Sequence, residues 1–267
     1  MTGIVVIISV IALIAFGFAA QKVIIKSRRR QWMTLRLTDE QRHAIGEDFK
    51  LFLRLPDNLR NELEGLMHVF MHEKSFEACG GLDEVTEHMR QIIAAQACLL
   101  LVNRKHDFYR RLRSILLYPS AYTAKDEHGE ESVRLGESWH SGSVILAWKS
   151  VKQGGRNEED GHHVTLHEFA HQLDQVDGVA DGVPELSGTG SYREWSVVFG
   201  KAFDRFQKKL EKGRRTVIDP YGATNPAEFF AVATETFYEK PAQLQEKYPE
   251  VYQQLRHYYN VDPLEWL

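Results

Sequence analysis

Apolar residues recur at helical spacing in three segments of the N-terminal half of the chain. A stripe of leucine, methionine and phenylalanine predicts a helix over residues 58–72. Thr38 and Gln41 match a capping box, which opens an earlier helix that ends before Pro56. A third helix is expected over residues 82–102, and its last part is an apolar run too short to span a membrane. These three helices therefore predict a mainly helical N-terminal part.

Short apolar runs with the character of strands come next. Residues 114–118 and 143–148 are such runs, and the polar stretch over residues 124–137 predicts a turn or hairpin between them. Gly154 and Gly155 are expected to begin a polar loop that ends at Gly161. After that loop the spacing is helical again, apart from a long loop over residues 178–191. Helices, then short strands, then helices again predict an α+β fold.

The start of the chain follows a different pattern. Residues 3–20 are eighteen consecutive residues without a charge, and five basic residues follow before residue 31. As a helix this run would extend roughly 27 Å, close to the hydrocarbon thickness of a bilayer. We therefore expect one N-terminal transmembrane helix, with residues 1–30 as anchor and basic flank and residues 31–267 as a cytoplasmic domain at the inner membrane. The alternatives are a buried core helix and a cleaved signal peptide, since residues 17–19 are an acceptable cleavage site.

Composition and charge narrow the function classes. The 267 residues are 43% hydrophobic and 26% charged, which is ordinary for a globular protein and excludes a disordered chain. The net charge is −4, but beyond the basic N-terminus 28 basic residues face 37 acidic ones, a net charge of −9. Such an acidic body argues against direct binding of nucleic acid. The two cysteines, Cys79 and Cys98, are expected to be reduced structural thiols.

One motif carries chemistry: His167-Glu168-Phe169-Ala170-His171 has the H-E-x-x-H pattern. On a helix the first and fifth positions share a face, so His167 and His171 can bind one Zn²⁺ ion. Glu168 would lie beside the metal, where a carboxylate can accept a proton from water. Asp174 shares the face of His167 and is a candidate to orient an imidazole, or equally a solvated carboxylate at the end of the helix. The motif predicts a zinc hydrolase.

A catalytic zinc needs a third protein ligand. The spacing of one large group of such enzymes requires a histidine at position 177, where this chain has Asp177. A glutamate on a later helix is the other common solution, and Asn225 and Pro226 open such a helix. Glu228 and Glu235 lie seven residues apart on it and both remain candidates, with Glu228 modestly favoured. The simpler interpretation of Glu228 is a helix-capping carboxylate.

The chain resembles the Mlc titration factor A family of zinc peptidases, also called DgsA anti-repressors, from Trp32 to the C-terminus. Three further blocks carry the resemblance besides HEFAHQLD: FEACGGLDEVTEHMRQIIAAQACLLL, WHSGSVILAW and YGATNPAEFFAVATETFYE. The family is in turn similar to the protease domain of anthrax lethal factor. The resemblance implies a zincin-like metallopeptidase, with Glu228 as the third zinc ligand and Tyr221 as an active-site tyrosine.

Two classes of function follow from this resemblance. The first is an enzyme, an aminopeptidase-like zinc metallopeptidase that acts on short peptides, with Glu168 as general base and Tyr221 as a hydrogen-bond donor to the oxyanion. The second is a regulatory protein without catalysis that sequesters the glucose repressor Mlc, and one chain could do both. We also expect the strand over residues 143–148 to lie at the edge of the site and to pair with an extended substrate.

Overall fold

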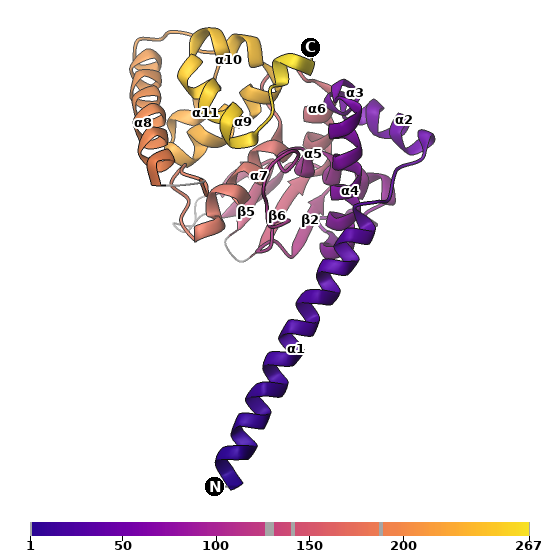
Figure 1. Cartoon of the computed structure of the whole chain (residues 1–267). Helices are drawn as coiled ribbons and strands as arrows, with labels where there is room; N and C mark the ends of the chain where they lie inside the picture. Colours follow the sequence, from indigo (N-terminus) through magenta and orange to yellow (C-terminus); the bar gives the residue numbers. More distant parts are fainter. Residues whose placement is uncertain (1, 126–130, 140–141, 187–188, 267) are drawn as a thin grey trace.

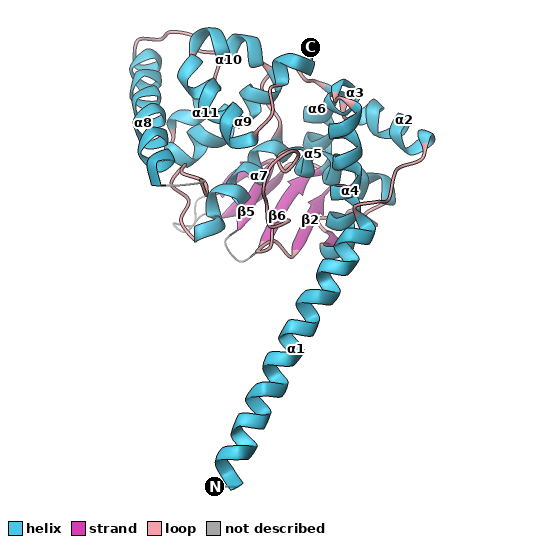
Figure 2. Ribbon diagram, in the orientation of Figure 1, coloured by secondary structure: helices cyan, strands magenta, loops and turns pink. Residues whose placement is uncertain are grey.

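The computed structural model describes residues 2–125, 131–139, 142–186 and 189–266. The described strands all lie between residues 75 and 147, with helices before and after them, so the predicted α+β fold is confirmed (Figures 1 and 2). The helices are α1 (Thr2–Trp32), α2 (Asp39–Asp48), α3 (Lys50–Arg54), α4 (Asp57–Glu73), α5 (Glu87–Leu99), α6 (Trp148–Arg156), α7 (Val164–Asp174), α8 (Thr189–Glu211), α9 (Pro226–Glu239), α10 (Pro241–Lys247) and α11 (Pro249–Tyr259). The strands are β1 (Ser75–Ala78), β2 (Ser114–Tyr118), β3 (Tyr122–Lys125), β4 (Glu131–Arg134), β5 (Gly136–Trp139) and β6 (Ser143–Ala147), and short 3₁₀ helices are η1 (Gln175–Asp177), η2 (Pro220–Ala223) and η3 (Pro263–Trp266).

Four strands form one sheet in the order β1-β2-β6-β5. β1, β2 and β6 are parallel, whereas β5 runs antiparallel to β6 and lies at the edge. The register sets Ile115 opposite Val144 and Leu117 opposite Leu146, and all four side chains are fully buried, which gives the sheet one apolar face. β3 and β4 pair separately as the hairpin that the polar stretch predicted, with residues 126–130 outside the described part of the chain.

Helix α7 lies in the middle of the molecule because apolar surfaces cover it from several sides. It contacts β5 and β6 of the sheet, α5 and α6 on the helical side, and α9 along its length. Leu166, Phe169 and Ala170 are fully buried in the common core. The two helices that carry the candidate ligands, α7 and α9, are therefore packed against each other.

Helix α1 projects from the body, with the N-terminus at its far end (Figure 1). Its C-terminal turns contact α4, where both oxygens of Glu73 accept hydrogen bonds of 2.7 Å from the Arg29 guanidinium and Trp32 stacks on His72 at 4.5 Å between ring centroids. Within the expected membrane span, residues 1–10 and 12 lie outside the residues whose side chains are described. In the part of the chain that is described, no helix is both long and apolar enough to cross a membrane.

Two segments differ from the prediction because of the way they pack. The helix expected to run to Pro56 is divided at Phe49, whose backbone is extended (φ −147°, ψ 90°) and whose side chain is fully buried. The Gly154-Gly155 pair was expected to begin a loop but lies inside α6. A Cβ atom at Gly155 would come within 2.1 Å of the carbonyl oxygen of Asp48, so a glycine is needed there for close helix packing.

Candidate metal centre and active site

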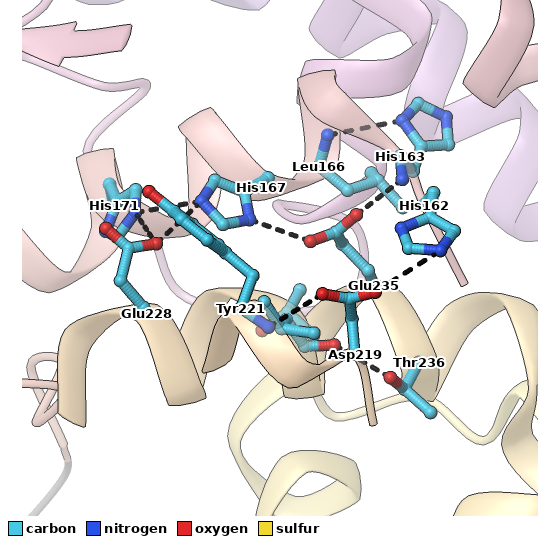
Figure 3. A network of polar contacts seen from close by, with 12 residues as sticks. His162, His163, Leu166, His167, His171, Asp219, Tyr221, Glu228, Glu235 and Thr236 are labelled. Carbon is cyan, nitrogen blue, oxygen red and sulfur yellow. Dashed lines mark hydrogen bonds and ion pairs between the residues drawn. The ribbon is translucent and has the colours of Figure 1, made fainter. Parts of the chain in front are cut away.

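The H-E-x-x-H motif lies on α7, as predicted. The helix begins after His163, whose Nδ1 accepts a hydrogen bond from the Leu166 N–H and caps the first turn. His167 and His171 are one turn apart, and their ring centroids are 4.8 Å apart. Both imidazoles point away from the apolar core and toward α9 (Figure 3). The local sequence thus buries one face of the helix and presents two metal-binding side chains on the other.

Helix α9 brings Glu228 to these histidines. Asn225 caps the helix through a hydrogen bond of 2.9 Å from the Glu228 N–H to its side-chain oxygen, as the sequence predicted. The Glu228 carboxylate itself turns toward α7, and its Oε2 lies 2.9 Å from His167 Nε2 and 3.3 Å from His171 Nε2. Burial opposes ionisation, but the neighbouring imidazoles of His167 and His171 lower the pKa of Glu228 to about 2.

The three side chains fit a metal ion. His167, His171 and Glu228 are the one group in the described part of the chain with three potential ligand atoms within 4.8 Å of one another. The two Nε2 atoms are 3.2 Å apart, and the carboxylate oxygen lies 2.9 and 3.3 Å from them. Ligands bound tetrahedrally at 2.0–2.1 Å stand about 3.3 Å from each other. Three potential ligand atoms at these separations can surround one cation.

Glu235 has a different place in the site. Its Oε1 lies 2.7 Å from His167 Nδ1, on the opposite edge of the imidazole from Glu228, and its Oε2 accepts a hydrogen bond from the His163 N–H (Figure 3). A carboxylate at Nδ1 keeps the proton on that nitrogen and leaves Nε2 as the free ligand atom. The structure therefore puts Glu228, and not Glu235, beside both Nε2 atoms. Glu235 holds the His167 ring in place.

Glu168 and Tyr221 lie beside these residues. The Glu168 side chain is buried, and burial together with the nearby Glu228 and Glu235 raises the pKa of its carboxyl to about 8. Tyr221 is 55% exposed on η2, and its ring reaches toward the histidines, with a centroid distance of 5.9 Å to His167 (Figure 3). Its backbone N–H donates to Asp219 Oδ1, which caps η2.

A cleft of about 810 Å³ opens over the cluster. It is lined by residues of β5, α6, α7, α9 and η2. Its described lining contains neither lysine nor arginine, and its carboxylates are Glu137, Glu168, Asp219, Glu228 and Glu235. A cleft with this lining favours a ligand group that carries positive charge or a metal.

The strand at the edge of the cleft is not the one that the sequence predicted. The strand expected at the edge, residues 143–148, forms β6, which pairs with β2 on one side and β5 on the other. Its backbone groups are therefore engaged inside the sheet, and its unbroken apolar run was the signal of an interior strand. β5 is the edge strand beside α7 instead. A Cβ atom at Gly136 would lie 2.6 Å from Glu168 Oε1, so this glycine leaves room for the carboxylate.

Two other residues have roles that the sequence did not reveal. Asp174 was expected to orient an imidazole, but its Oδ2 accepts a hydrogen bond of 2.9 Å from the Gly182 N–H and so holds the following loop. His162 lines the cleft, and its Nε2 lies 3.4 Å from Asp219 Oδ2. His162 and Asp219 are far apart in the chain, so no sequence spacing could predict that their side chains meet.

Comparison with known proteins agrees with this geometry. The model of the family described as glucose-regulated metallo-peptidase M90 matches residues 24–260. An uncharacterized protein of Synechocystis sp. is 40% identical over 246 residues, which cover 89% of each chain. Mlc titration factor A of Cronobacter sakazakii is 28% identical over 225 residues, 80% of this chain and 83% of the relative, and that of Klebsiella pneumoniae strain 342 is 29% identical over 217 residues, 77% and 80%.

The match covers far more than the metal-binding motif, because it extends from the end of α1 to the end of α11. It therefore includes both helices that supply the candidate ligands, the edge strand β5, and η2, which carries Tyr221. The chain belongs to the glucose-regulated metallo-peptidase M90 family, together with the Mlc titration factor A proteins.

Proposed function

We propose that this protein is a zinc-dependent peptidase that hydrolyses short peptides with Glu168 as general base. The observation that carries the proposal is the triangle of ligand atoms from His167, His171 and Glu228, with spacings close to those of a tetrahedral zinc site. A structural zinc usually has four protein ligands, which leave no position for water. This site has two imidazoles and one carboxylate, with a buried glutamate next to them, and such a set suits a catalytic zinc better.

A zinc ion bound there would supply Lewis acidity and lower the pKa of a bound water. Residues of the chain would transfer the proton, stabilise the oxyanion and orient a ligand. Glu168, with its raised pKa, accepts a proton from the attacking water and returns it to the leaving amine. The Tyr221 hydroxyl donates a hydrogen bond to the oxyanion that develops on the substrate carbonyl. Glu235 keeps the His167 ring fixed throughout.

The preference for a free N-terminus is part of the proposal. An aminopeptidase must accept the α-ammonium group of its substrate, and the cleft offers carboxylates without a competing lysine or arginine in its described lining. The edge strand β5 beside α7 supports a substrate backbone that lies extended along it.

A second function, binding of a transcriptional repressor, is suggested by the relatives named Mlc titration factor A. We propose that this chain also captures such a repressor. This function does not require Glu168, so it can be separated from catalysis. A purely regulatory protein would bind the repressor and show no hydrolysis at all.

The Glu168→Gln variant tests the enzymatic proposal. The amide cannot accept the proton, so hydrolysis of short peptides should fall by about 10²–10⁴-fold while the zinc content stays unchanged. Glu211→Gln, at an exposed end of α8, is the matched control and should keep full activity. Undiminished hydrolysis in Glu168→Gln would reject Glu168 as the base. A zinc-loaded wild-type protein that cleaves no peptide would favour the purely regulatory function.

A further inference from the structure

The end of α8 carries a concentration of positive charge that neither the candidate site nor the family comparison explains. Residues 201–215 contain seven lysines and arginines against two acidic residues. The domain that carries them has a net charge of −9 over residues 31–267, with 28 basic and 37 acidic residues. We define the basic corner as Arg205, Lys208, Lys209, Lys212, Arg214 and Lys247.

The corner is held together by defined contacts. Arg205 and Lys209 both lie over the ring of Tyr248, at 5.0 and 4.8 Å from its centroid. The Arg205 guanidinium donates to the Lys247 carbonyl oxygen at 2.7 Å, and the Arg214 N–H donates to the Lys209 carbonyl oxygen at 3.0 Å. Gly213, with φ +65°, makes the reversal that folds Arg214 back. These contacts thus join residues from α8, the turn after it and the end of α10.

These charges are close enough to repel one another. Burial and the neighbouring cations Arg205, Lys247 and Arg214 lower the pKa of Lys209. Elsewhere many arginines are neutralised by carboxylates, as in the pairs of Arg42 with Glu64 and Arg156 with Asp48.

Within the described part of the chain, the ion pair of Lys247 with Glu246 is the one such contact in the corner. The helix dipole stabilises a cation or two in the last turn of α8, but it does not account for six basic residues from three segments. Uncompensated repulsion of this kind lowers stability, and an anionic partner would relieve it.

We propose that the basic corner is the docking surface for an acidic segment of a partner protein. A nucleic acid is less suited, because Tyr248 is only 3% exposed beneath its cations and the acidic body around the corner repels a long polyanion. A lipid surface is less suited, because the described large hydrophobic residues exposed on the molecule include none within residues 201–215.

The corner is distinct from the cleft in its electrostatics. The carboxylate-lined cleft disfavours an acidic ligand, whereas the corner attracts one. An acidic segment would therefore bind outside the site where we propose hydrolysis, and the docking proposal does not rest on hydrolysis. In the chain only residues 215–218 separate Arg214 of the corner from Asp219, which lines the cleft.

The test measures binding of a fluorescent peptide of alternating glutamate and serine to the full chain by anisotropy. The triple variant Lys208→Glu, Lys212→Glu and Arg214→Glu changes three exposed side chains that do not contact the Tyr248 ring. Lys26→Glu, Lys105→Glu and Lys149→Glu, three exposed lysines elsewhere, make the same change in net charge and serve as the control.

We expect the wild type and the control to bind the peptide alike, and the corner variant to bind at least about tenfold more weakly. Affinity should also fall as salt rises from about 50 to about 200 mM. Equal binding by the corner variant and the control would overturn the proposal. If the corner variant lost more affinity for a single-stranded oligonucleotide, or for phosphatidylserine vesicles, than for the peptide, relative to the control, the proposal would also be overturned. Hydrolysis of a neutral peptide should be the same in all three proteins.

Discussion

Glu228 and Glu235 lie two turns apart on α9 and contact opposite edges of the same imidazole. The sequence left the third ligand open between them because both share one helix face. The distinction depends on tertiary placement: the N-terminus of α9 approaches the Nε2 atoms, while the next turns approach Nδ1. The spacing of the two glutamates on α9 does not predict which edge of the His167 ring on α7 each of them contacts.

This placement predicts different outcomes for the two glutamates. Glu228→Ala should abolish stoichiometric zinc binding, because it removes a direct ligand atom. Glu235→Ala should keep the metal with an affinity about 10–100-fold lower, since it removes only the group that orients His167. Zinc titration against a chromogenic chelator measures both constants. The reverse order of effects would make Glu235 the ligand.

Tyr221 is the residue whose role is least defined by its own contacts. If its hydroxyl acts on the oxyanion, Tyr221→Phe should lower kcat by about 10²–10³-fold and leave KM and zinc content nearly unchanged. Steady-state kinetics with a short peptide measure this split. An unchanged kcat in the zinc-loaded variant would mean that the ring only packs over His167.

At the scale of elements, the sequence predicted single helices and hairpins better than the contacts between distant elements. The capping box at Thr38, the helix over α4, the hairpin and α7 with its motif follow from local patterns and are confirmed. The edge position of β5 and the helical Gly154-Gly155 pair depend on contacts between distant segments. Strand order and glycine packing are tertiary properties, so local spacing could not predict them.

The far end of α9 gives a prediction about pH. Glu239 is 5% exposed, and no basic side chain forms an ion pair with it in the described part of the chain. Burial, and then the nearby Glu235 and Asp160, raise the pKa of Glu239 well above its usual value near 4.5. The folded protein keeps this proton where the unfolded chain loses it, so the contribution of Glu239 to stability decreases as pH rises above about 4.5.

Glu239→Gln should therefore stabilise the fold at pH 8 and have little effect at pH 4.5. The difference in the free energy of unfolding should grow with pH by at most about 1.4 kcal/mol per unit. Thermal unfolding of both proteins across this range measures it, and the comparison cancels groups that titrate in both. A difference that stays constant with pH would show that Glu239 is ionised in the fold.

At the scale of the whole molecule, the packed body and the N-terminal helix α1 have different surroundings. The body closes a core around α7, whereas α1 extends away from it with Leu13 and Phe16 more than 70% exposed. We retain the prediction that residues 3–20 anchor the protein at the inner membrane with its peptidase domain in the cytoplasm. The chain should then sediment with membranes, and deletion of residues 2–30 should release an active protein. A mature protein that begins near Ala20 would instead indicate a cleaved signal peptide.

The central claim is that His167, His171 and Glu228 bind one catalytic zinc. Anomalous diffraction at the zinc edge, from crystals of the zinc-loaded protein, tests it most directly. The account predicts one zinc per chain at about 2.0–2.2 Å from both Nε2 atoms and from a Glu228 oxygen, with Glu235 outside the ligand shell. A zinc bound elsewhere, or one coordinated by Glu235 in place of Glu228, would contradict it.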